Sequence, residues 1–285
     1  NVTRLFGEAA ALRLNLGDDL LSPRGIEIAR ARSALDATRG AGAPEMGLIF
    51  EATAAAAYSS IGLENAASHL IVVDMGAGTT DIAALAATGG RLGEIPEARV
   101  TLKQAGDFVD GIIANIALDA HGKLKTPAQQ TEFWRVIMAD MRGFKETLFA
   151  TGRAAFRFDK RVVNVSLKDL ERDKDFRLFG SALSEAYERG IAALRDRALA
   201  DGYREVHAIA VGGGAAAPFI KALIQRKPRN AGKVKVIARP ATPSWAHAPA
   251  FNGNLAPVFP QLAIAIGGAL APESMIAARG GVSQA

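Results

Sequence analysis

Residues 70–81 limit the possible folds of this chain more than any other stretch. They read LIVVDMGAGTTD: an apolar run long enough for a buried strand, then an acid, a Gly-Ala-Gly turn, two threonines and a second acid. Two glycines alone would indicate only a tight turn. Two carboxylates and two hydroxyls placed around that turn, at the end of a buried strand, predict a binding site there.

The chemistry of the turn at residues 76–78 favours a bound phosphate. Glycines let backbone N–H groups approach an anion without a Cβ in the way, and the two threonines add hydroxyl donors at the same edge. Asp74 and Asp81 would repel a phosphate unless a divalent cation with its waters stood between them, which is how Mg²⁺ usually meets phosphates. The turn therefore predicts a Mg²⁺–phosphate site.

A second glycine turn follows another predicted strand. Residues 206–211 are apolar except for His207, residues 212–214 are three glycines, and Pro218 stands where the first turn of a helix tolerates proline. No acid accompanies this turn, so it suits the flat face of a base or a ribose. Neither turn has the G-x-G-x-x-G spacing of a dinucleotide-binding fold.

The remaining pattern alternates helices with short strands. We expect helices at residues 26–39, stopped by Gly40 or Gly42, and at 52–58, 108–119, 127–149, 181–199 and 219–226. We expect strands at residues 47–50 and 70–74, β-type alternation at 155–167, and an irregular proline-rich surface loop at 239–260. Residues 82–87 fit a strand or a helix equally well.

Composition excludes several classes of protein. There is no cysteine, so disulfides and thiolate metal sites are absent, and no apolar run reaches the length of a membrane span. The net charge is +5, but the basic residues are scattered among 29 acidic ones. Only three tyrosines and two tryptophans are available to stack on nucleic-acid bases. We expect a cytoplasmic protein that binds neither nucleic acid nor a membrane.

Five short motifs resemble a known family in their order and spacing. They are EATAAA at residues 51–56, DMGAGTTD at 74–81, GDFVD at 106–110, VGGG at 211–214 and AIAIGGA at 263–269. Together they are similar to the nucleotide-binding domain of heat-shock-seventy chaperones, within the actin-like ATPase superfamily, and the resemblance covers essentially the whole chain. It implies an α/β fold of the actin-like, ribonuclease H-like class.

The resemblance also implies a domain layout. Residues 1–69 would be a remnant of the first lobe, residues 70–257 the second lobe with a helical subdomain inserted at about 108–199, and residues 258–285 a helix that returns toward the first lobe. The start of the first lobe, with its own phosphate turn and lysine, and the peptide-binding domain have no counterpart here. We therefore expect that this chain alone does not hydrolyse ATP.

Site residues follow from the resemblance position by position. Asp74 and Asp81 would hold Mg²⁺ through water, Thr79 would bond the terminal phosphate, and Glu51 would orient the metal's water or the attacking one. The catalytic set implied is Glu51, Asp74 and Thr79, the metal set is Asp74 and Asp81, and the ATP- or ADP-binding set is Gly76, Ala77, Gly78, Thr80, Lys145, Gly212, Gly213 and Gly214.

Four positions depart from the family pattern. Ala52 follows the glutamate in place of a proline, and Ala77 replaces the middle glycine of the phosphate turn. Arg142 stands where an acid usually binds the sugar, and Ala216 where an arginine usually covers the adenine. We therefore expect phosphate and Mg²⁺ binding with loose selectivity, within about tenfold, between ATP and GTP.

The function implied is ATP binding and hydrolysis that drives closure of two lobes, with a client or partner protein responding to it. One alternative is an interaction module or scaffold that binds nucleotide without turnover, and another is a small-molecule kinase of the same superfamily. Release of phosphate from ATP without an added acceptor separates hydrolysis from both alternatives.

Overall fold

The computed structural model describes residue 9 and residues 12–17, 26–37, 50–60, 69–88, 91–122, 124 and 126–270. The chain forms two compact units, Asn1–Leu48 and Ile49–Ala285. In the first unit, helix α2 (Ile28–Asp36) confirms the predicted helix, and Asn15 donates a hydrogen bond to the Ala34 carbonyl. The predicted stop at Gly40 or Gly42 lies outside the described residues; of the strand predicted at residues 47–50 only Phe50 is described, and it is not part of a strand.

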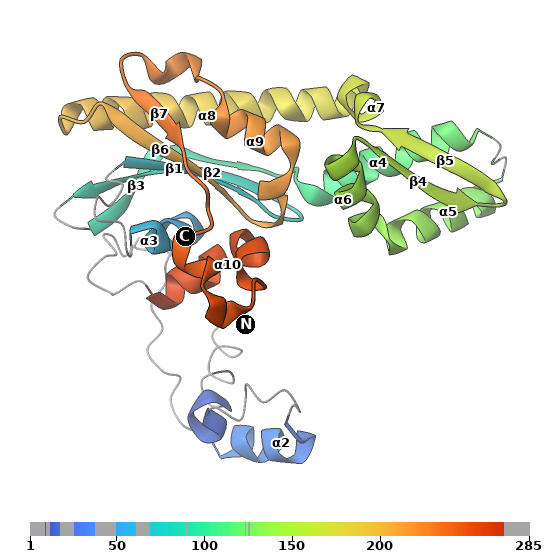
Figure 1. Ribbon diagram of the computed structural model, residues 1–285, viewed down its shortest axis with the longest axis horizontal. Coiled ribbons are helices and arrows are strands. Elements are labelled where there is room, and N and C mark those ends of the chain that lie inside the picture. Colours follow the sequence, from blue (N-terminus) through green and yellow to red (C-terminus); the bar gives the residue numbers. More distant parts are fainter. Residues whose placement is uncertain are drawn as a thin grey trace, which may run out of the picture. The chain divides into compact units, whose positions relative to one another are not determined.

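The second unit is built on a five-stranded sheet of order β3-β2-β1-β6-β7 (Figure 1). Strands β1, β2 and β3 form an antiparallel meander, whereas β6 and β7 add to β1 in parallel. Residues 82–87, which fitted a strand or a helix, form part of β2. The strands are β1 (His69–Met75), β2 (Thr80–Thr88), β3 (Arg91–Leu102), β6 (Glu205–Val211) and β7 (Lys235–Ala238).

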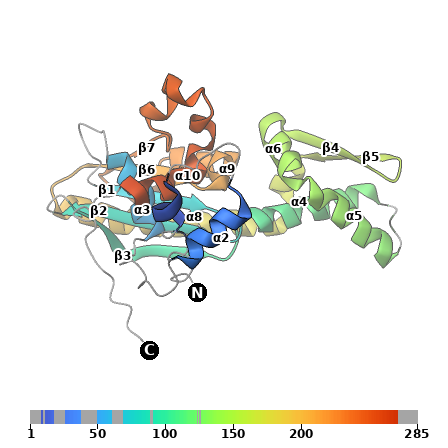
Figure 2. The same cartoon turned by 90° about the horizontal axis from the view of Figure 1, so that it is seen from below.

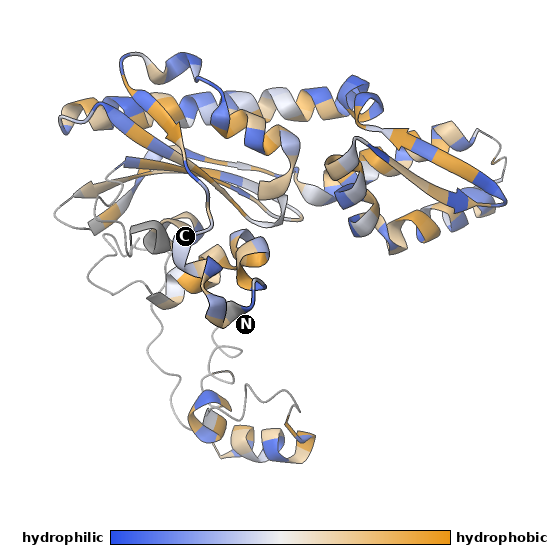
Figure 3. Ribbon diagram, viewed as in Figure 1, coloured by the Kyte–Doolittle hydropathy of each residue, from blue (hydrophilic) through white to orange (hydrophobic). Residues whose placement is uncertain are grey.

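Helices cover both faces of this sheet. Ile71 and Val73 of β1 face the core under α8 (Lys174–Ala200) and α9 (Pro218–Gln225), while Leu70 and Val72 face the core under α3 (Glu51–Ser60) and α10 (Leu255–Leu270). All seven residues of β1 are therefore buried, as an apolar run with no polar alternation requires. Figure 3 shows hydrophobic and hydrophilic residues alternating along α8, as expected for a helix with one face against a sheet.

Helices α3 and α10 cross in close contact. A Cβ added at Gly267 of α10 would collide with the carbonyl oxygen of Ala54 in α3, so the two backbones meet where no side chain intervenes. The run of small residues in α3 predicted a close approach to a sheet, and α3 does contact β1, β2 and β3. The small residues of α3 also pack against α10.

An inserted segment between β3 and α8 lies beyond one end of the sheet (Figures 1 and 2). The β-type alternation at residues 155–167 is confirmed as the hairpin β4–β5, which turns through Asp159 and Lys160 at positive φ. The elements of the insertion are α4 (Gly106–His121), α5 (Pro127–Ala139), α6 (Met141–Thr151), β4 (Arg153–Phe158), β5 (Arg161–Ser166) and α7 (Leu167–Arg172).

The single helix predicted at residues 127–149 is wrong. The chain leaves helical geometry at Asp140, with φ −125° and ψ 23°, and continues as α6. The break lets Phe133 of α5 and Phe144 of α6 both pack edge-on against Phe156 of β4, with ring centroids 5.3 and 5.7 Å away. Periodicity could not show the break because both helices carry apolar residues at the same spacing.

The interpretation of residues 239–260 as a surface loop is also wrong. Ala246 is fully buried, Trp245 packs against Phe259, and α10 has already begun at Leu255. Pro260 lies inside α10 and has no N–H to give to the Ala256 carbonyl. The hydroxyl of Thr242 donates to that carbonyl instead, at 3.3 Å, which lets the helix run through the proline.

Within the described part of the chain, no helix combines the length and the apolar character that crossing a membrane would require.

A buried hydroxyl in α8 yields a first prediction about stability. Tyr187 is fully buried, burial raises the pKa of its phenol, and its oxygen has no hydrogen-bond partner among the described residues. We expect Tyr187→Phe to raise the free energy of unfolding by about 1 kcal/mol, since it removes an unsatisfied buried polar group. Urea denaturation measures this change. The control Tyr203→Phe, at a half-exposed ring, should stay within about 0.5 kcal/mol, and a less stable Tyr187→Phe would contradict the prediction.

Candidate functional site

The two glycine turns leave the same edge of the sheet side by side. Strands β1 and β6 are parallel neighbours, and Asp74 at the end of β1 pairs with Val211 at the end of β6. Gly212 has φ 82°, and a Cβ there would collide with a carboxylate oxygen of Asp74 and with the Met75 carbonyl. The second turn is therefore packed directly against the acid that begins the first.

Hydrogen bonds hold two carbonyls of the first turn against the start of α4. The Gly76 carbonyl accepts from the Gly106 N–H at 3.1 Å and the Ala77 carbonyl from the Asp107 N–H at 2.8 Å, both at the start of α4. The Gly76 N–H is used within the turn, donating to the Thr79 carbonyl at 3.0 Å. Within the described residues, the backbone amides of residues 77–79 make no hydrogen bond, and these residues are exposed. They are free to bind an anion.

The two threonines of the turn differ in their surroundings. Thr79 is exposed. Thr80 is fully buried, and its hydroxyl donates to the Gln104 carbonyl at 2.8 Å. The prediction that both hydroxyls reach the ligand is thus corrected for Thr80. Its hydroxyl is bonded to the connection between β3 and α4 instead.

Three carboxylates predicted for the site influence one another electrostatically in the structure. Asp74 and Asp81 are directly opposite in the β1–β2 pairing, and the Thr101 hydroxyl donates to Asp81. Burial raises the pKa of Asp74 to about 6, with further contributions from the negative charges of Glu51 and Asp81. Glu51 itself is exposed at the first turn of α3. A buried carboxylate beside two other acids is stabilised by a nearby cation.

The donor set fits Mg²⁺ held through water. Among the residues that the structure describes, no group of three or more His, Asp or Glu side chains gathers closely enough to cage a metal by itself. Mg²⁺ commonly keeps several waters and takes one or two carboxylates together with phosphate oxygens. Asp74 and Asp81, flanking the turn, match that arrangement.

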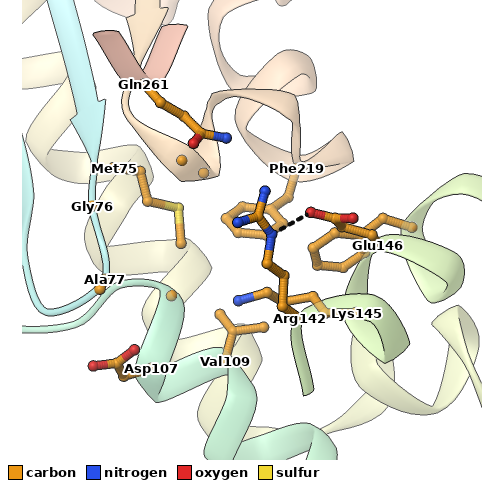
Figure 4. Close-up of a pocket in the computed structure, with 14 residues that line it drawn as sticks. Met75, Gly76, Ala77, Asp107, Val109, Arg142, Lys145, Glu146, Phe219 and Gln261 are labelled. Carbon is orange, nitrogen blue, oxygen red and sulfur yellow. Dashed lines mark hydrogen bonds and ion pairs between the residues drawn. The ribbon is translucent and has the colours of Figure 1, made fainter. Parts of the chain in front are cut away.

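A cavity of about 270 Å³ opens between the two turns and α6 (Figure 4). Of the residues predicted for the site, Gly76, Ala77, Lys145, Gly213 and Gly214 line it. The predicted residues that do not line it are Glu51, Asp74, Gly78, Thr79, Thr80, Asp81 and Gly212.

The cavity contains polar residues that sequence reasoning did not assign to the site. The Lys145 ammonium lies 2.7 Å from the Asp110 carboxylate of α4, so this cation is already neutralised. Arg142, noted only as a departure, projects into the cavity, with Glu146 beside it and Gln261 of α10 across from it (Figure 4). Spacing on one helix face could have indicated Glu146, whereas only the tertiary structure brings in Gln261.

Comparison with known proteins gives three matches. A family model described as MreB/Mbl protein matches residues 20–154. A chaperone protein HscA homolog from Verminephrobacter eiseniae is 32% identical over 181 residues, which is 63% of this chain and 27% of that protein. The actin-like protein MamK from Paramagnetospirillum magneticum is 47% identical over 57 residues, 20% of this chain and 15% of that protein.

The matches agree with the fold, although they cover only about a quarter or less of each relative. The mixed sheet with helices on both faces confirms the predicted α/β, actin-like class. Likeness to the heat-shock-seventy type is supported at 32% identity by the HscA homolog. The sheet order, the paired turns and the three matches together support an actin-like ATPase type of nucleotide-binding domain.

Proposed function

We propose that this chain forms one side of a site that binds a Mg²⁺–nucleoside triphosphate, ATP by the resemblance, and that the protein hydrolyses its terminal phosphate. The proposal rests on one observation above all: the free amides of residues 77–79 lie between Asp74 and Asp81. Donors for an anion and acids for a cation are thus combined in one turn, as a Mg²⁺–phosphate group requires.

Each residue has a distinct role in this proposal. The amides of residues 77–79 and the Thr79 hydroxyl bind phosphate oxygens, while Asp74 and Asp81 hold the waters around Mg²⁺. Mg²⁺ bound there supplies positive charge that offsets the charge on the transferring phosphoryl group. Glu51, exposed at the start of α3 and close enough to raise the pKa of Asp74, orients the attacking water.

The nucleoside lies beside the second turn in this arrangement. Gly213 and Gly214 line the cavity with backbone only, so a flat sugar or base can approach closely. Lys145, held by Asp110, approaches the nucleoside from α6. We further propose that residues 70–257 are the second lobe of a two-lobed domain, and that nucleotide-driven closure of the lobes is sensed by a client or partner protein.

The test is the affinity of Asp74→Asn for Mg²⁺–nucleotide, measured by calorimetry with ADP and ATP. Asparagine keeps the shape that Gly212 packs against but removes the charge that offsets the metal's. We expect affinity to fall at least tenfold, equivalent to about 1.4 kcal/mol. Chelating Mg²⁺ should weaken binding by the wild-type chain more than binding by the variant.

A matched control is Asp196→Asn, which removes an exposed carboxylate paired with Arg195 on α8. It should bind nucleotide as the wild type does. Wild-type affinity in Asp74→Asn would overturn the metal assignment. Hydrolysis is tested separately, in a protein that also supplies the other side of the site, by phosphate release from ATP that requires Mg²⁺ and is lost in Asp74→Asn; the 285-residue chain alone should release none.

A further inference from the structure

An exposed ion pair lines the cavity beside the nucleoside turn. Arg142 and Glu146 are one helical turn apart on α6, with the Arg142 Nε 2.9 Å from a Glu146 carboxylate oxygen. Their side chains are 76% and 64% exposed. In Figure 4 the Arg142 guanidinium and the Glu146 carboxylate lie next to each other, joined by their ion pair.

The Arg142–Glu146 ion pair is more exposed than the ion pair of Lys145, which also lines the cavity. The side chains of Lys145 and Asp110 are only 22% and 13% exposed, so their ion pair is held between α4 and α6. Arg142 and Glu146 are on one helix, and an exposed pair of that kind contributes little to stability. It can therefore open onto a ligand at low cost, presenting a carboxylate acceptor and a guanidinium donor together.

The walls around the pair suit a flat, largely apolar ring. Met75, Val109, Phe149 and Phe219 line the cavity, and Gly213 and Gly214 leave one side without side chains. A purine held between such walls would turn its polar edge toward the open rim, where Arg142 and Glu146 stand. Small-molecule sites commonly combine apolar walls with a few polar groups that set specificity.

We propose that Glu146 and Arg142 read the base, and that the site accepts guanine nucleotides at least as well as adenine nucleotides. This inference rests on the proposed nucleotide function. A carboxylate only accepts hydrogen bonds. Guanine offers it two adjacent donors, N1–H and the N2 amine, and offers the acceptor O6 to Arg142. Adenine offers one donor at N6, and its N1 is an acceptor that would face a carboxylate oxygen unfavourably.

The experiment compares GDP, IDP and ADP, each with Mg²⁺, as competitors of a fluorescent GDP on the full 285-residue chain. IDP differs from GDP only by lacking the N2 amine of the base, so the ratio of GDP to IDP affinity isolates one hydrogen bond to Glu146. We expect GDP to bind at least as tightly as ADP and about tenfold more tightly than IDP, since a charged acceptor loses its donor.

The variant Glu146→Gln should bring GDP and IDP within about threefold of each other, while ADP affinity changes less than threefold. Glu132→Gln is the matched control, because Glu132 is also an exposed glutamate paired with an arginine on its own helix, but it lies outside the cavity. It should leave all three affinities unchanged. Circular dichroism of both variants should match that of the wild type, which checks that they keep their helices.

Two results overturn the inference while leaving the proposed function intact. One is ADP binding more tightly than GDP, and the other is a GDP-to-IDP ratio that Glu146→Gln does not change. If none of the three diphosphates binds, the proposed function itself is wrong and the inference falls with it.

Discussion

Replacing Gly267 with alanine is expected to destabilise the second unit by about 3 kcal/mol or more. The added Cβ would collide with the carbonyl oxygen of Ala54, a backbone atom that no rotamer change can move. Helices α3 and α10 would have to separate, which opens the core formed with Leu70 and Val72. Because α3 begins at Glu51, the separation would also displace that carboxylate from Asp74. Chemical denaturation measures the loss.

The next residue supplies a matched control. Gly268 lies in the same helix, and the atom nearest to a Cβ added there is the Ala54 Cβ at 4.0 Å, an ordinary contact. Gly268→Ala should be neutral or stabilising by up to about 1 kcal/mol, since alanine is the better helix former. Equal stability of the two variants would show that the helices do not cross as closely as described.

Gly212→Ala is expected to damage both stability and nucleotide binding. With φ 82° and ψ 174°, Gly212 occupies a region that is essentially restricted to glycine, and a Cβ there would collide with the Asp74 carboxylate and the Met75 carbonyl. Strain of this kind costs about 1–3 kcal/mol before the collision is counted. Relieving the collision would move Asp74, so Mg²⁺–nucleotide affinity should also fall at least tenfold. Denaturation and a fluorescent-nucleotide titration measure the two effects.

Gly213→Ala tests whether the loss of stability in Gly212→Ala comes from that position or from removing any glycine of the turn. A Cβ at Gly213 meets no atom within 4 Å, so stability should stay within about 0.5 kcal/mol of the wild type. Since Gly213 lines the cavity, only its stability serves as the control. A Gly212→Ala variant that matches Gly213→Ala in stability and the wild type in binding would contradict the close packing of the two turns.

The sequence by itself determined the kind of fold and predicted the kind of site. The apolar run at residues 70–73 has no polar alternation, so it had to be a strand covered on both faces. The glycine turn after it carries donors and acids within eight residues, and local chemistry alone indicates phosphate and Mg²⁺. The strand is confirmed, and the Mg²⁺–phosphate site stays a prediction; both could be inferred because the groups they depend on are close together along the chain.

Only the tertiary structure decided which of those groups are free. The Gly76 N–H and the Thr80 hydroxyl donate to the Thr79 and Gln104 carbonyls, while the amides of residues 77–79 have no partner among the residues that the structure describes. Pro260, expected in a loop, lies inside α10 because Thr242 satisfies the carbonyl that proline leaves unpaired. A sequence shows which donors and acceptors exist, but the partners that satisfy them often come from distant segments, and folding decides which remain for a ligand.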